Sequence, residues 1–108
     1  MSEFVDYLTE VFEQFGPIQA KRMFGGYGIY HDGLMFALVA DDTLFLKTDK
    51  TITHFFESMH LPQFEYDRKG KLIKMSYHQA PEELFEDREM AAEWASRSFQ
   101  VALIQKRS

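Results

Sequence analysis

The stretch from Arg22 to Gly33 reads RMFGGYGIYHDG, and it is the first place in this sequence where residue types and spacing suggest chemistry. Four of the chain's six glycines lie between Gly25 and Gly33. A glycine-rich loop binds phosphate when it leads into a helix amino terminus, as in the GxGxxG and GxxxxGK[ST] motifs. GGYG matches neither motif, and a strand and a hairpin turn follow it. A nucleotide site here is therefore the weaker interpretation.

The favoured interpretation is a β-strand whose glycines let another side chain or backbone approach closely. In the predicted pairing, Gly26 and Gly28 lie opposite or diagonal to Ala37 on the next strand. We expect these three residues to form a flat, close-packing face. Either a helix of the same domain or a partner would cover it.

Residues for ordinary catalysis are sparse. The serines form no nucleophile-elbow pattern, and no pair of carboxylates stands out from the acidic helix surfaces. His54 and His60 are six residues apart, which is not the i, i+4 spacing of a helical metal site, and His31 and His78 lie far from them. We expect no catalytic residue, no metal and no cofactor. A metal site assembled from distant strands and an enzyme with a deep polar pocket stay open as alternatives.

Basic residues gather in the seven-residue stretch RKGKLIK. It contains Arg68, Lys69, Lys71 and Lys74, and Arg22 and Lys47 border the predicted sheet. A protruding basic hairpin can contact a phosphate backbone, so these six residues are the candidate partner or nucleic-acid contacts. The alternative is a solvated hairpin tip. Four phosphate contacts would give a log–log salt slope of only about −3.6, so we expect any nucleic-acid binding to be weak.

Periodicity predicts an α+β order of helix, three antiparallel strands, helix, two strands and helix. Ser2 is the expected N-cap of the first helix, which Gly16-Pro17 should end. The remaining elements are expected at 24–31, 34–40 and 43–48 (strands), 50–59 (helix), 63–67 and 72–77 (strands), and from Asp87 to about Gln105 (helix), with a helical first turn at Pro81. Asp32-Gly33, Asp41-Asp42 and Lys69-Gly70 are the predicted turns.

If the first two turns are two-residue loops, both faces of the three-stranded sheet are apolar. One face would carry Tyr27, Ile29, Phe36, Leu38 and Phe45, and the other Gly26, Gly28, Ala37, Val39, Leu44 and Leu46. Such a sheet requires a cover on each side, from helices or from a second copy of the protein. If the helices cover one face only, the other is a candidate dimer or partner surface.

Composition indicates a single soluble domain over residues 1–108. The chain has 108 residues, no cysteine and 45% hydrophobic residues, which supports one core without disulfides. The net charge of −5 argues against a protein whose whole surface binds nucleic acid. The start MSEFVDYLTE is acidic where a secretion signal would be basic and then apolar, so we expect a cytoplasmic protein. No apolar run approaches the roughly 20 residues that a membrane span needs, so we expect no membrane span.

The segment RMFGGYGIYHDGLMFALVADDTLFLKTD, followed later by FEYDRKGKLIKMSYHQAPEELFED, resembles the N-terminal domain of the TfoX/Sxy family of bacterial competence regulators. The resemblance covers about residues 10–105. It implies the α+β order given above, with a fold similar to type III secretion chaperones and YjbR-like domains. Full-length family members carry a second, helical C-terminal domain that this sequence lacks, so the chain is either a stand-alone relative or one domain of a longer protein.

The resemblance also implies a role in regulating transcription through contacts with other proteins, and it transfers no catalytic residues. We therefore expect a non-catalytic regulatory domain that binds a protein partner. A homodimer is one alternative for that partner. The second hypothesis is a nucleic-acid-binding module that uses the hairpin at 68–74.

Overall fold

The computed structural model describes residues 2–23 and 25–107 and contains one sheet and three α-helices. Phe24, the first residue of one predicted strand, lies outside the described residues. The elements in chain order are α1 (Glu3–Val11), β1 (Gln19–Met23), β2 (Gly26–His31), β3 (Leu34–Ala40), β4 (Thr43–Lys47), α2 (Thr53–Glu57), β5 (Gln63–Arg68), β6 (Lys71–Gln79), the 3₁₀ helix η1 (Glu82–Glu86) and α3 (Arg88–Arg107).

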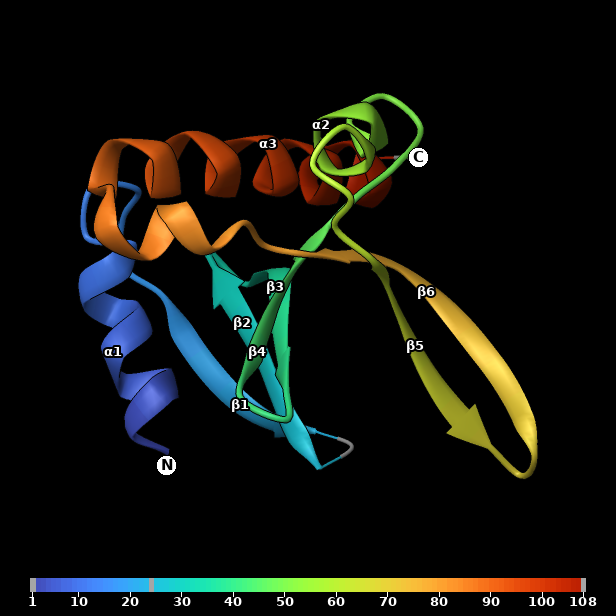
Figure 1. Ribbon diagram of the computed structural model, residues 1–108. Helices are drawn as coiled ribbons and strands as arrows, with labels where there is room; N and C mark the ends of the chain where they lie inside the picture. Colours follow the sequence, from blue (N-terminus) through green and yellow to red (C-terminus); the bar gives the residue numbers. More distant parts are fainter. Residues whose placement is uncertain (1, 24, 108) are drawn as a thin grey trace.

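The six strands form one antiparallel sheet in the order β1-β2-β3-β4-β6-β5. The helices pack on one face of it, with α3 running over β3 and β4 and α2 beside β6. The β5–β6 hairpin projects from the body of the domain (Figure 1). The predicted α+β class is confirmed, and β1 is a strand that the sequence prediction did not include. No helix in the described part of the chain is long and apolar enough to cross a membrane.

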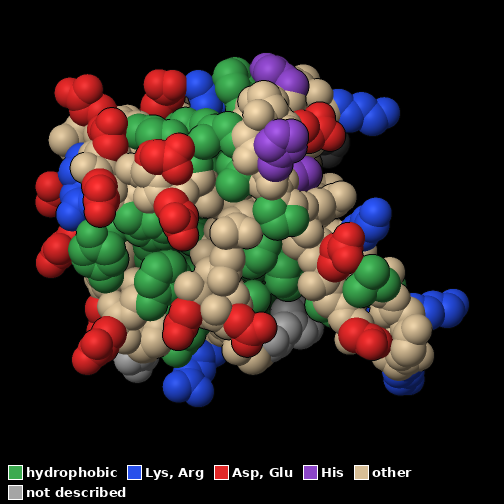
Figure 2. Space-filling view, in the orientation of Figure 1, with side chains coloured by type: hydrophobic (Ala, Val, Ile, Leu, Met, Phe, Trp, Pro, Cys, Tyr) green, Lys and Arg blue, Asp and Glu red, His purple; other side chains and the backbone are tan. Residues whose placement is uncertain are grey.

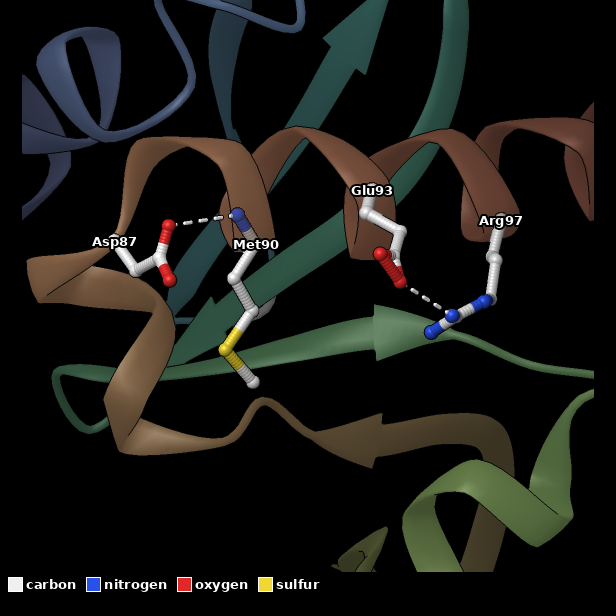
Figure 3. Close-up of polar contacts among 4 residues, drawn as sticks. All are labelled: Asp87, Met90, Glu93 and Arg97. Carbon is white, nitrogen blue, oxygen red and sulfur yellow. Dashed lines mark hydrogen bonds and ion pairs between the residues drawn. The ribbon is translucent and has the colours of Figure 1, made fainter.

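Side-chain caps start the first and last helices. The Ser2 hydroxyl accepts a hydrogen bond of 3.1 Å from the Val5 amide at the start of α1, as predicted. The Asp87 carboxylate accepts one of 3.0 Å from the Met90 amide at the start of α3 (Figure 3). Each cap satisfies an amide that the helix itself leaves without a partner.

Three two-residue turns set the register of the hairpins. In each turn both residues have positive φ, between 48° and 81°, which is the type I′ geometry that matches the twist of the flanking strands. The turns are Asp32-Gly33, Asp41-Asp42 and Lys69-Gly70. All three predicted turns are confirmed, including the aspartate pair, whose sequence signal is the weaker one.

A β-bulge between β2 and β3 changes the faces of the sheet. Ile29 pairs with Ala37, whereas Tyr30 pairs with Met35, so Phe36 is the extra residue on β3. On the side of the bulge away from the Asp32-Gly33 turn, each β2 residue pairs with a β3 residue one position further along than the turn alone would predict. The predicted faces are therefore wrong: Ala37 lies opposite Ile29 under the helices, and Gly28 lies opposite Leu38 on the other face.

The main core lies between the helices and the sheet. Its centre is built from side chains with no exposed surface, which are Leu8, Val11, Phe12, Ile29, Phe36, Ala37, Leu46, Leu84, Ala91 and Ala95. The α3 residues that face the sheet are mostly small, and this lets the helix lie close to β3. The helices therefore cover this face of the sheet over its central strands, β3 and β4.

Candidate functional site: the outer face of the sheet

We call the sheet face opposite the helices the outer face. By strand alternation it carries mainly apolar and aromatic side chains from all six strands. Its apolar members are Met23, Tyr30, Met35, Leu38, Phe45, Phe64, Tyr66, Ile73, Met75 and Tyr77. Most of them are only half-buried, in contrast to the core on the helix side. A large apolar surface without a helix over it is typical of an interaction site.

An apolar groove of about 290 Å³ lies on this face, between the β5–β6 hairpin and strands β1 to β3. We call it the outer groove. Its lining includes Met23, Met35, Leu38, Phe64, Tyr66 and Met75. Three methionines on three different strands give it flexible, polarizable walls that can adapt to the shape of a ligand. Among the described residues that line it there is no Asp, Glu, His, Lys or Arg, so the groove itself is suited to apolar groups.

The two strand glycines shape this side of the sheet. A Cβ atom on Gly26 would overlap the backbone carbonyl oxygen of Val39, and one on Gly28 would lie 2.7 Å from the sulfur of Met23 and 3.0 Å from that of Met35. The glycines therefore make room for the domain's own backbone and methionines. Because Gly28 carries no side chain, Met23 and Met35 can meet above it beside the groove.

A cluster of two lysines and two tyrosines lies beside the groove. The Lys21 Nζ is 4.6 Å from the centre of the Tyr30 ring, and the Lys47 Nζ is 5.0 Å from that of Tyr77. Burial raises the pKa of Tyr77 to about 12, with a smaller contribution from the charge of Tyr30. Burial also lowers the pKa of Lys47. These groups place positive charge on the rim of an apolar surface.

The six predicted basic contacts do not form one surface. Lys47, Arg68 and Lys71 belong to the outer face by register, whereas Arg22 pairs with Tyr27 and belongs to the helix side. Lys69 lies in the hairpin turn. Lys74 is on the other side of the hairpin, with its Nζ 3.9 Å from the Glu65 carboxylate. Figure 2 shows Lys and Arg side chains spread around the free end of the hairpin.

Apart from Gly26, the predicted site residues include none that line the groove, and they do not include Lys21. A signal was present for the hairpin: alternation along 63–68 and 71–79 already places Phe64, Tyr66 and Met75 on one side. No local signal indicates that these residues approach Met23 and Met35, because the curvature of the sheet brings them together. Lys21 was missed because the strand that carries it, β1, was not predicted.

Two of the histidines have structural partners. The His78 Nδ1 lies 2.9 Å from the Thr48 hydroxyl, in a buried pair near α2. The His31 Nδ1 lies 2.7 Å from the Pro17 carbonyl oxygen, and its ring packs on Phe15. The described residues contain no group of three or more His, Cys, Asp or Glu side chains placed to hold a metal ion.

Comparison with known proteins agrees with this architecture. The family model described as the TfoX N-terminal domain matches residues 10–102. The chain is also similar to a DNA transformation protein, TfoX1, of Aliivibrio fischeri (strain ATCC 700601 / ES114), with 27% identity over 86 residues. That alignment covers 80% of this chain and 41% of the relative, so the chain spans about two fifths of the relative's length. Because the family model covers most of the chain, this protein belongs to the TfoX N-terminal domain family.

Proposed function

We propose that this domain is a cytoplasmic, non-catalytic regulator of bacterial transcription, of the competence type, which acts by binding another protein through its outer groove. The observation that carries the proposal is the apolar groove on the sheet face that the helices leave uncovered. Family membership supports the competence context, because the similar protein of Aliivibrio fischeri is named a DNA transformation protein.

The non-catalytic part of the proposal has its own support. The groove is lined by apolar side chains, whereas a catalytic site requires convergent polar groups around a reacting atom. His78, a buried titratable residue, is held by Thr48 on the helix side of the sheet, away from the groove. Its position suits a structural role.

The test compares transcript levels in the bacterium that encodes the chain. Strains would carry the wild-type gene, a deletion, Met75→Glu, which places a charge in the groove, or the control Lys74→Glu on the other side of the same strand. We expect Met75→Glu to reproduce the deletion's transcript changes and Lys74→Glu to match the wild type. A deletion that leaves all transcripts unchanged would refute the regulatory role.

Nucleic-acid binding by the β5–β6 hairpin is the second candidate function. It is favoured by the exposed basic side chains of Arg68, Lys69 and Lys71 on a projecting ribbon. A fluorescence titration with duplex DNA at low and physiological salt tests it. Saturable binding that is lost on replacing Arg68, Lys69 and Lys71 by Glu would support this function, and absence of binding at low salt would rule it out.

A further inference from the structure

The charged side chains of the outer face share one sign. Within the described strands, alternation places four charged side chains on the outer face, and all are basic: Lys21, Lys47, Arg68 and Lys71. The neighbouring acids lie elsewhere, with Glu65 and Asp67 on the opposite side of the hairpin and Asp41-Asp42 in a turn. The chain carries 17 acids and a net charge of −5, so a wholly basic face contrasts with the rest of the molecule.

The basic residues of the outer face lie next to groove residues along the strands or across the ladders. Lys21 lies two residues from Met23 on β1, Arg68 lies two residues from Tyr66 on β5 and pairs with Lys71 on β6, and Lys47 of β4 pairs with Tyr77, two residues from Met75. A ligand that fills the groove with apolar groups would therefore meet cations on more than one side. The matching chemistry is an apolar segment that carries carboxylates, because complementary charge selects partners and speeds their association.

A second copy of this chain fits the outer face less well than an acidic, apolar segment does. In a symmetric dimer the same patch meets itself, so each copy would bring four basic side chains and no described acidic strand residue to the interface. Like charges brought together at an interface cost binding free energy. The groove's sign of charge thus favours a different, acidic partner.

Single-stranded nucleic acid is also a poorer match, although the face is basic and aromatic. Base stacking requires exposed ring faces. The rings here pack on each other or under lysine: Phe45 and Phe64 have centroids 4.9 Å apart, and Tyr77 is 5% exposed beneath Lys47. Tyr66, at 38% exposed, is the most open ring of the face.

We infer that the outer groove binds an acidic amphipathic segment of a partner protein, whose apolar side chains enter among Met23, Met35 and Met75 and whose carboxylates pair with Lys21, Arg68 and Lys71. This inference rests on the proposed function, since it specifies the partner of the same groove. Methionine walls accept apolar side chains of different shape, as amphipathic segments require.

The experiment is a selection from a random peptide library displayed on phage. The wild-type domain and the variant carrying Lys21→Glu, Arg68→Glu and Lys71→Glu are selected in parallel. We expect the wild type to enrich peptides rich in both acidic and apolar residues, and the variant to enrich basic and apolar ones. For a synthetic peptide from the wild-type selection, fluorescence anisotropy should show binding at least about tenfold weaker to the variant, as expected from the loss of two or three surface ion pairs.

Matched variants locate the binding. Lys74→Glu reverses a charge on the same strand but on the other side of the hairpin, and it should leave affinity within about twofold, because a charge that does not face the ligand is screened. Met75→Glu should abolish binding of the wild-type-selected peptide. If Met75→Glu does not fold, Tyr66→Glu replaces it, because that ring is 38% exposed and its loss affects the core little.

The possible outcomes distinguish the acidic-segment inference from the proposed protein-binding function. Peptides that require Met75 but show no excess of acidic residues would overturn the acidic-segment inference and leave the protein-binding function standing. No peptide that requires Met75, together with binding of oligothymidine, would overturn both. Light scattering that shows a dimer lost in Met75→Glu would assign the groove to a second copy and would also overturn the inference.

Discussion

Ile29 of β2 lies directly opposite Ala37 of β3, and the neighbouring Phe36 has no partner across the ladder. This bulge turns both Phe36 and Ala37 toward the helices, where each is fully buried. Leu38 consequently faces the other way and forms part of the floor of the outer groove. The position of one unpaired residue therefore decides which apolar side chains of β3 face the helices and which face the outer groove.

The two sides of the sheet should respond differently to the same truncation. Leu46→Ala removes a side chain with no exposed surface from the main core, and we expect a loss of about 2 to 5 kcal/mol in the free energy of unfolding. Leu38→Ala should cost less although Leu38 is only 7% exposed, because it borders the outer groove, and the space left by truncation opens into that groove instead of forming a closed cavity. Urea unfolding of both variants tests this, and equal losses would argue that the groove is as tightly packed as the core.

The two strand glycines should differ in their tolerance of a methyl group. Gly26→Ala would force a Cβ against the Val39 carbonyl oxygen, which cannot move without disturbing the β2–β3 ladder, so we expect a loss of about 1 to 3 kcal/mol. Gly28→Ala meets mainly the ends of flexible methionine side chains and should cost less. Thermal and urea unfolding measure both, and the opposite order would contradict the geometry.

His78 should make stability depend on pH. Burial lowers its pKa below the ordinary 6.5, and the charge of Glu57 opposes this more weakly. Because the unfolded chain then binds the proton more readily, the free energy of unfolding should be fully retained above pH 6.5 and should fall as pH drops toward the folded-state pKa.

The control for this pH dependence is His78→Asn, which keeps a group able to accept the Thr48 hydroxyl proton but does not titrate. Urea unfolding at neutral and mildly acidic pH compares the two proteins. The difference between them should grow in favour of the variant on acidification. A difference that stays constant with pH would show that His78 does not contribute.

Arg97 on α3 should matter through its aromatic contacts. Its guanidinium carbon is 3.7 Å from the centre of the Phe55 ring and 5.2 Å from that of Trp94, and its Nη2 donates to Glu93 at 2.8 Å (Figure 3). We expect Arg97→Ala to cost about 1 to 2 kcal/mol from the loss of ring packing, and Glu93→Ala less than about 0.5 kcal/mol, because Glu93 is 61% exposed. Equal effects in chemical unfolding would mean that the ion pair dominates.

Elements with local signals were predictable from the sequence. Ser2 and Asp87 mark helix starts through their own side chains, and dipeptides such as Asp32-Gly33 suit type I′ turns by residue type. Each of these features depends on a few adjacent residues. A single sequence is therefore sufficient to recognise them.

Features that depend on distant residues were not predictable. β1 reads QAKRM, which is largely polar because it is an exposed edge strand, so apolar alternation does not reveal it. The bulge at Phe36 depends on how β3 packs against the helices, and a one-residue shift moved Ala37 to the other face. The outer groove forms only where the folded sheet brings distant strands together. Neither its lining residues nor the basic residues beside it could therefore be predicted from the sequence alone.

The methionine methyl groups offer the most direct test of the central claim that the outer groove is a protein-binding site. In a ¹H–¹³C NMR titration with the acidic, apolar peptide from the library selection, the methyl signals of Met23, Met35 and Met75 should shift. Those of Met59, exposed after α2, and Met90 on α3 should stay in place. Shifts confined to Met59 or Met90, with the groove methyls unchanged at saturation, would contradict the claim.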